Sequence, residues 1–276
     1  MIAPFVDADF LAAHPEAVLA DVRWYLDGRD GRAAFEAGHI AGALWVDLDH
    51  QLAGTGQPAT EGRHPLPTPA AFAAAMASLG IANDTLVIAY DDTGGLTAGR
   101  LAVMLRMLGC DAAVLAGGLG AWTGEVETGA GRHPVPAKFT ATDWPSERLA
   151  TADDVALIAA AGGAVLDARS LERFRGEVTQ IDKRPGHIPG ARSAPWSATL
   201  AADGTPRSPT DLREHYRSLG IDDDDGHDVV AYCGSGVSAC MNVLAMEHAG
   251  FAAPRRYVAS WSGWSADPNR EGATGE

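Results

Sequence analysis

The sequence predicts an α/β protein made of two tandem copies of one domain, each a mainly parallel sheet with helices on both faces. Short apolar segments of strand length alternate with segments of helical length, which is typical of parallel sheets covered by helices. The same order of segments occurs twice within the 276 residues. This length suits about two domains, and 46% apolar with 21% charged residues is ordinary for a globular chain.

The duplication is indicated by five matching segments that keep the same order in both halves. Their spacing is nearly constant, between 140 and 148 residues. A period of this length is far too long for a solenoid, so we interpret it as a duplicated domain. The matches pair Asp21-Val-Arg23 with Asp167-Ala-Arg169, Gly38-His-Ile with Gly186-His-Ile, Ser78-Leu-Gly-Ile81 with Ser218-Leu-Gly-Ile221, Leu86-Val-Ile-Ala-Tyr-Asp91 with Asp228-Val-Val-Ala-Tyr-Cys233, and Trp122 with Trp264.

In the first copy, strands are expected over 17–22, 85–90 and 112–115, and helices over 69–79 and 98–108. A further short strand should follow Gly38-His-Ile. Thr68 precedes Pro69, a pair typical of a capped helix start. The strand segments are continuously apolar, as expected for strands buried on both faces.

The second copy repeats this order. Its strands are expected over 164–168, 228–232 and 255–258, its helices over 209–219 and 238–248, and Ser208 before Pro209 repeats the cap. Prolines, glycines and threonines gather between the copies, which indicates a linker. We expect a first domain over residues 1–125, a linker over 126–147 and a second domain over 148–276.

Charge and cysteine content exclude several classes of protein. The net charge of −15 argues against binding along nucleic-acid phosphates, which requires a basic face. No apolar run approaches the ~20 residues of a membrane helix, and the first ten residues lack the basic start of a signal peptide. Three cysteines are too few for a disulfide framework. We therefore expect a cytoplasmic protein that binds neither nucleic acid nor membrane.

The two copies differ where the central strand ends. Asp91 in the first copy is replaced by Cys233 in the second, followed by Gly-Ser-Gly-Val-Ser and a helix. Ligands of open α/β sheets bind beyond the carboxyl ends of the strands. Glycines let backbone N–H groups converge, and a helix N-terminus adds further donors. We therefore expect a lowered pKa and a thiolate nucleophile at Cys233.

A simpler interpretation makes Cys233 a small strand-end residue, since free cysteines are usually buried and inert. The glycine-rich loop and the helix after it favour the nucleophile. Cys110 and Cys240 lack such a loop and are expected to be packing residues, with a resolving-thiol role for Cys240 as the weaker alternative.

Together, these motifs resemble the tandem rhodanese-like sulfurtransferases, the thiosulfate and 3-mercaptopyruvate enzymes, over essentially the whole chain. The residues that carry the resemblance are the two Gly-His-Ile turns, Asp167-Ala-Arg169, Arg173-Phe-Arg-Gly176, Cys233-Gly-Ser-Gly-Val-Ser-Ala239 and Ser260-Trp-Ser-Gly-Trp264. The family carries its catalytic cysteine in the second domain and an aspartate at the equivalent place in an inactive first domain, which Asp91 fits.

The resemblance implies that the Cys233 thiolate takes sulfur from a small-molecule donor and holds it as a persulfide. A second nucleophile, such as cyanide, a dithiol or thioredoxin, then removes that sulfur. No metal or organic cofactor is implied. The loop residues implied in substrate binding are Gly234, Ser235, Gly236, Val237 and Ser238.

Two features bear on the donor. In the thiosulfate type the two positions after the cysteine are basic, whereas Gly234 and Ser235 are neutral and resemble the 3-mercaptopyruvate type. Arg173 matches the anion-binding arginine of the family, and its guanidinium suits a carboxylate. The 3-mercaptopyruvate type has a second arginine before Gly-His-Ile, for which Arg184 is the candidate, although it stands only two residues before Gly186. Ser235 either handles a proton near the thiol or caps the following helix.

Three alternatives remain open from the sequence. The related phosphatases have an arginine where this loop has Ala239, so phosphatase activity is disfavoured. A silent docking module would lack the cysteine. A thiosulfate-specific enzyme, or a relay that receives persulfide sulfur from a protein partner, would keep Cys233.

Overall fold

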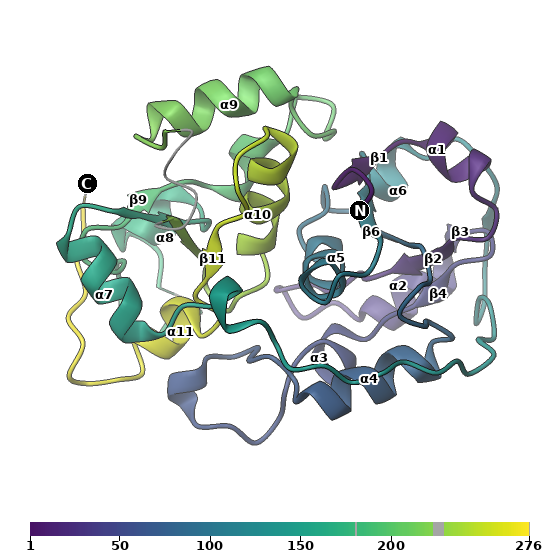
Figure 1. The fold of residues 1–276 in the computed structure, drawn as a ribbon, viewed down its shortest axis with the longest axis horizontal. Helices are drawn as coiled ribbons and strands as arrows, with labels where there is room; N and C mark the ends of the chain where they lie inside the picture. Colours follow the sequence, from purple (N-terminus) through teal and green to yellow (C-terminus); the bar gives the residue numbers. More distant parts are fainter. Residues whose placement is uncertain (180, 223–228, 276) are drawn as a thin grey trace. The chain divides into compact units, whose positions relative to one another are not determined.

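The computed structural model of the protein describes residues 1–179, 181–222 and 229–275 (Figure 1). The chain divides into two compact units. The first unit comprises Met1–Thr55, Leu66–Trp144 and Ala202–Pro206, and the second comprises Gly56–Pro65, Pro145–Ala201 and Arg207–Glu276. Residues 56–65 thus belong to the second unit although they lie in the first half of the sequence. The domain boundaries expected from the sequence stay a prediction.

The first unit is built on a five-stranded parallel sheet in the order β1-β6-β5-β2-β4. Its strands are β1 (Phe5–Val6), β2 (Val18–Asp21), β4 (Leu44–Trp45), β5 (Val87–Tyr90) and β6 (Ala112–Leu115), and β3 (His39–Ile40) pairs antiparallel with β7 (Val126–Glu127). Its helices are α1 (Ala8–Ala13), α2 (Gly31–Ala37), α3 (Leu48–Gln51), α4 (Pro69–Ser78), α5 (Ala98–Met107) and α6 (Gly118–Ala121).

The second unit has four parallel strands among its described residues, in the order β11-β10-β8-β9. These are β8 (Ala164–Asp167), β9 (Arg192–Ser193), β10 (Val229–Tyr232) and β11 (Arg255–Arg256). Its helices are α7 (Ala152–Ala160), α8 (Leu171–Arg175), α9 (Pro209–Ser218), α10 (Ala239–His248) and α11 (Ser260–Trp264). Across the described part of the chain, no helix combines the length and the apolar character that crossing a membrane requires.

Successive residues of β8 and β10 pack on opposite faces of the second sheet. On one face, Leu166 and Val229 pack with apolar residues of α9 and α10 (Figure 1). On the other face, Val165 and Val230 pack with residues of α7 and with Trp261 of α11. Both faces are covered, which explains why these strands are apolar up to their last residues, Asp167 and Tyr232.

The structure confirms the α/β class and the elements expected on both sides of Cys233. The long helices and central strands begin and end within two residues of their expected bounds, although Asp228 lies outside the described residues. Thr68 and Ser208 cap α4 and α9 as predicted, by accepting the backbone N–H of the third helical residue. The strand expected over 255–258 is shorter, and short helices such as α8 were not foreseen because five residues are too few to show a helical period.

A buried ion pair recurs at the same place in the two units. The guanidinium of Arg23 bonds the Asp21 carboxylate and donates to the Gly38 carbonyl oxygen at 2.7 Å. Arg169 does the same with Asp167 and with the carbonyl oxygen of Gly186 at 2.8 Å. The pairs therefore connect the strand end to each Gly-His-Ile turn and brace it.

We expect Asp21→Ala to destabilise the protein by about 3–5 kcal/mol, because it leaves the buried Arg23 guanidinium without its carboxylate. The control is Asp27→Ala, since Asp27 makes the same contacts with Arg29 two residues later but at the exposed surface. Urea unfolding should show a large loss for the first variant and little change for the second. Equal losses would show that burial of the pair is not what matters.

Candidate active site

Cys233 stands directly after β10 at the carboxyl edge of the second sheet, with its side chain buried. Its backbone is fixed by α11. The Cys233 N–H donates to Ser260 Oγ at 3.1 Å, and the Trp261 N–H donates to the Cys233 carbonyl oxygen at 2.9 Å. Ser260 has a φ of +55°, an uncommon conformation for a residue with a β-carbon. The backbone of Cys233 is therefore held by a buried serine in a strained conformation.

The loop after Cys233 curls around the sulfur. The Gly236 N–H donates to Cys233 Sγ at 3.1 Å, from a backbone with φ of +81° that suits glycine. Burial alone raises the pKa of the Cys233 thiol, but hydrogen bonds from the Ser238 hydroxyl and from the backbone N–H groups of Ala239, Ser235 and Gly236 outweigh it. The net effect lowers the pKa of Cys233, so more of it is thiolate at neutral pH.

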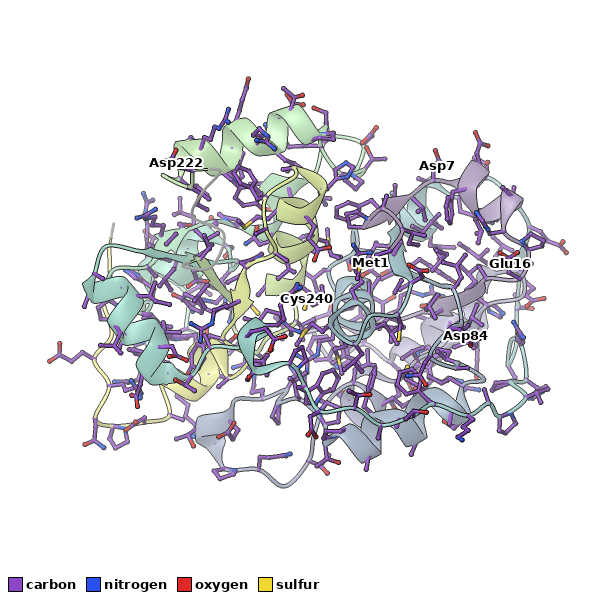
Figure 2. The ribbon with its side chains drawn as sticks, in the orientation of Figure 1. Met1, Asp7, Glu16, Asp84, Asp222 and Cys240 are labelled. Atoms are coloured by element: carbon purple, nitrogen blue, oxygen red, sulfur yellow. The ribbon has the colours of Figure 1, made fainter. Side chains whose placement is uncertain are left out.

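Two neighbouring side chains, those of Arg256 and Cys240, contact this loop at the carbonyl oxygen of Gly236. Arg256 of β11, itself buried, donates to the Gly236 carbonyl oxygen at 3.1 Å. The thiol of Cys240, in α10 and labelled in Figure 2, lies 3.6 Å from the same oxygen. Gly236 is therefore held through both of its peptide groups, with its N–H bonded to the sulfur and its carbonyl oxygen bonded by Arg256. Cys110 and Cys240 are both buried, in keeping with packing roles.

Ser235 is engaged by a histidine that the sequence did not indicate. His64 Nδ1 lies 2.8 Å from Ser235 Oγ, and both side chains are buried. His64 comes from residues 56–65, which pack on α11 within the second unit. There the Arg63 N–H donates to Ser262 Oγ at 3.1 Å. The Ser235 hydroxyl is therefore hydrogen-bonded to an imidazole ring, and the N-terminus of α10 has no side-chain cap.

Two arginines border the loop at Gly234. A β-carbon on residue 234 would lie 2.8 Å from Nη2 of Arg173 and 3.1 Å from Nη2 of Arg63. Arg173 lies in α8 and is the arginine that the sequence predicted for anion binding, whereas Arg63 was not predicted. Both guanidinium groups bond the carboxylate of Asp182. The loop is neutral in sequence, but its surroundings are cationic.

Arg184 has different partners. Its guanidinium donates to the carbonyl oxygens of Trp264, Ser265, Asp267 and Arg270, all in the C-terminal segment. The substrate-binding role expected for Arg184 thus has no support in these contacts. In this structure the second arginine at the loop is Arg63, which is far from Gly-His-Ile in the sequence.

The corresponding loop of the first unit contains its own anion. The buried Asp91 carboxylate accepts backbone hydrogen bonds from Thr93, Gly95, Thr97 and Ala98 at 2.8–2.9 Å, and another from the Thr97 hydroxyl at 3.0 Å. Helix α5 begins seven residues after Asp91, whereas α10 begins six residues after Cys233. The N–H groups that could hold a substrate anion are therefore occupied by a side chain.

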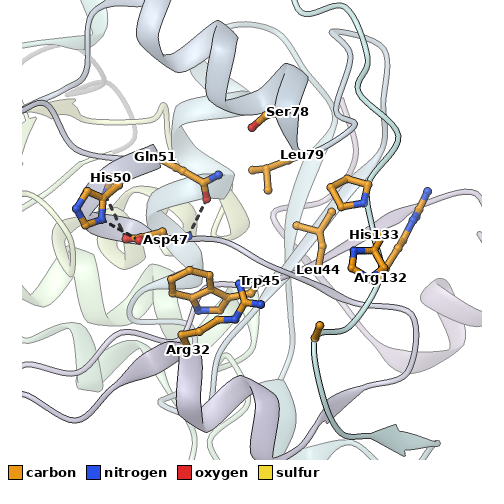
Figure 3. A pocket seen from close by; sticks show the side chains of 12 residues that line it. Arg32, Leu44, Trp45, Asp47, His50, Gln51, Ser78, Leu79, Arg132 and His133 are labelled. Atoms are coloured by element: carbon orange, nitrogen blue, oxygen red, sulfur yellow. Dashed lines mark hydrogen bonds and ion pairs between the residues drawn. The ribbon is translucent and has the colours of Figure 1, made fainter.

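The first unit also has an open cavity of about 420 Å³, shown in Figure 3. The Asp47 carboxylate accepts a hydrogen bond from the His50 ring at 2.8 Å, which raises the pKa of His50. The backbone N–H of Asp47 donates to the side-chain oxygen of Gln51. Arg32 lies over the ring of Trp45 on another wall. The described residues that line this cavity do not include a cysteine.

The sequence model of the rhodanese-like domain matches residues 8–125 and 151–267. The chain belongs to the rhodanese-like family. Among relatives of this tandem rhodanese-like chain, a Pseudomonas aeruginosa protein named as a 3-mercaptopyruvate sulfurtransferase is 38% identical over 282 residues, covering 99% of both chains. A Mycobacterium tuberculosis protein named as a thiosulfate sulfurtransferase, SseB, is 40% identical over 271 residues, covering 94% of this chain and 91% of the relative.

A solved structure agrees with these relatives. The crystal structure of SseA from Escherichia coli, described as having the rhodanese fold of the 3-mercaptopyruvate enzymes, matches with a TM-score of 0.79 and 30% identity. The match covers 94% of this chain and 99% of SseA. The rhodanese-like sulfurtransferase family expected from the sequence motifs is thereby confirmed.

We expect iodoacetamide to alkylate Cys233 with a pH midpoint below the ordinary thiol value of about 8.5, because loop hydrogen bonds stabilise the thiolate. Ser238→Ala should move that midpoint upward, since it removes the hydroxyl that bonds the sulfur. The matched control is Ser218→Ala, whose exposed hydroxyl bonds the His215 carbonyl oxygen in α9. Alkylation rates followed by peptide mass spectrometry give the midpoints, and an unchanged midpoint in Ser238→Ala would contradict the assignment.

Proposed function

We propose that this rhodanese-like sulfurtransferase takes sulfur from 3-mercaptopyruvate, holds it as a persulfide on Cys233 and passes it to a thiol acceptor or to cyanide. The observation that carries the proposal is the arrangement at Cys233, whose sulfur accepts loop N–H hydrogen bonds that lower its pKa. A stabilised thiolate attacks sulfur, and the same N–H groups can hold the negative charge of a terminal persulfide sulfur.

The first half-reaction forms a sulfur–sulfur bond and breaks a carbon–sulfur bond. The Cys233 thiolate attacks the thiol sulfur of 3-mercaptopyruvate, and the carbon–sulfur electron pair leaves with pyruvate as its enolate. The enolate needs a proton on carbon to become pyruvate. Ser235 is placed to give that proton, because its hydroxyl bonds His64, which can replace it.

The donor carboxylate needs a cationic partner. Arg173 and Arg63 border Gly234 and can receive it, and we propose Arg63 rather than Arg184 as the second arginine. Gly234 fits this arrangement, since a larger residue there would meet both guanidinium groups. The other loop residues, from Ser235 to Ser238, supply N–H and hydroxyl donors.

The second half-reaction returns the cysteine to its starting state. A thiolate acceptor or cyanide attacks the outer sulfur, the sulfur–sulfur bond breaks, and Cys233 leaves as thiolate. A dithiol such as thioredoxin can complete the transfer by closing its own disulfide and releasing the sulfur as sulfide. Thiosulfate is the second donor candidate, supported by the name of the Mycobacterium tuberculosis relative.

Brief exposure to 3-mercaptopyruvate should add one sulfur, about 32 Da, to the intact protein through a persulfide on the nucleophile. The added mass should disappear on treatment with cyanide. The Cys233→Ser variant should gain nothing, whereas Cys110→Ser should behave like the parent. Failure of both 3-mercaptopyruvate and thiosulfate to load the parent would favour a partner-fed relay or a docking protein.

His64→Asn and Ser235→Ala should lower turnover with 3-mercaptopyruvate by about 10²- to 10⁴-fold, the usual range for a lost proton donor. Turnover with thiosulfate should fall much less, since sulfite leaves without needing a proton on carbon. His14→Asn, at an exposed position of the first unit, is the control. Steady-state kinetics with both donors make the comparison, and equal losses would indicate that His64 only supports the loop.

A further inference from the structure

Asp182 is a buried carboxylate shared by three arginines. Its Oδ2 accepts from Arg173 Nη2 at 2.7 Å and from Arg169 Nη1 at 3.3 Å, and its Oδ1 lies 3.3 Å from Arg63 Nη1. Only 2% of the side chain is exposed, whereas Arg173 is 17% and Arg63 33% exposed. The Asp182 carboxylate is therefore buried among the three guanidinium groups, whereas Arg173 and Arg63 are partly exposed to solvent.

The charges around Asp182 leave one positive charge on the side of the loop where Gly234 lies. Arg169 is already matched by the buried carboxylate of Asp167. Among the described residues, Arg63 and Arg173 form ion pairs with one shared carboxylate, that of Asp182, so these three groups together carry +1. The nearby charges of Glu177 and Lys183 are exposed, opposite in sign and screened by water.

That charge faces the nucleophile's loop. The Nη2 atoms of both arginines lie within about 3 Å of where a β-carbon of residue 234 would stand. No arginine or lysine side chain could be added at position 234 without meeting them. Beside Gly234 the positive charge thus comes from residues 63 and 173, and Asp182 sets its amount, whereas Arg256 bonds the loop at Gly236.

We propose that Asp182 is a specificity-determining residue, which limits the charge of the arginine group beside Gly234 to one and so selects monoanionic carboxylate donors over dianions. This rests on the proposed function and names the charge class of its donor. A carboxylate monoanion is fully matched by a site of +1. A dianion such as thiosulfate would leave one charge unmatched beside the thiolate, in a partly buried place where unpaired charge is costly.

Removing the Asp182 charge should therefore favour binding of thiosulfate more than binding of 3-mercaptopyruvate. Each added positive charge attracts a dianion twice as strongly as a monoanion at the same distance. Asp182→Asn, with a site charge of +2, should raise the ratio of thiosulfate to 3-mercaptopyruvate kcat/KM by about tenfold. A purely structural aspartate would change both values by the same factor.

Two further variants make the test independent of how well Asp182→Asn folds. Arg63→Gln, at a partly exposed position, lowers the site charge to zero and should lower the ratio by about tenfold. The double variant Asp182→Asn with Arg63→Gln restores +1 and should bring the ratio back to within about threefold of the parent. Asp153→Asn is the control, because Asp153 pairs with Arg270 at the surface of the same unit.

The kinetics should be measured with both donors at low and at 0.5 M salt, and circular dichroism should show the parent spectrum for each variant used. The differences in ratio should shrink at high salt as the charges are screened. The role of Asp182 would be overturned if the ratio of the two kcat/KM values did not change with the site charge. It would also be overturned if the ratio of the double variant did not return to that of the parent. A parent that forms no persulfide with either donor would instead overturn the proposed function itself.

Discussion

The site depends on how a buried negative charge is compensated at the end of a strand. Parallel strands bring their carboxyl ends to one edge, where a side chain is enclosed by the following loop and helix. In both units this position holds a group that is or becomes an anion, Asp91 or Cys233, and both are buried. Backbone N–H groups of the loop provide the compensation, so the loop conformation is inseparable from the charge.

The two units show two solutions to this constraint. The Asp91 carboxylate has two oxygens on a short side chain and takes five hydrogen bonds from its own loop. At Cys233 a single sulfur accepts the hydrogen bonds of its loop instead, from the Ser238 hydroxyl and from backbone N–H groups. One substitution at the strand end, with a loop shorter by one residue, thus separates a self-contained turn from a reactive one.

The sequence predicted the parts of this structure that are local or repeated. Continuous apolar strands, the proline-led helices α4 and α9 and the loop at Cys233 all leave a pattern in neighbouring residues. Arg63 and His64 leave none, because their role depends on where residues 56–65 pack on α11. Arg184 is an arginine close to the position expected for the second substrate-binding arginine, before Gly186-His-Ile. Its guanidinium, however, donates to backbone carbonyl oxygens. Long-range packing decides such cases, and a single sequence does not record it.

The assignment of residues 56–65 to the second unit has a consequence for how the duplicated chain could evolve. A first copy that lost its cysteine would ordinarily be free to decay or be deleted. Here, deletion of the first copy would also remove His64 and Arg63 from beside the nucleophile of the second. The second copy therefore depends on a segment encoded in the first half of the gene. A gene encoding the second half alone would encode Cys233 without His64.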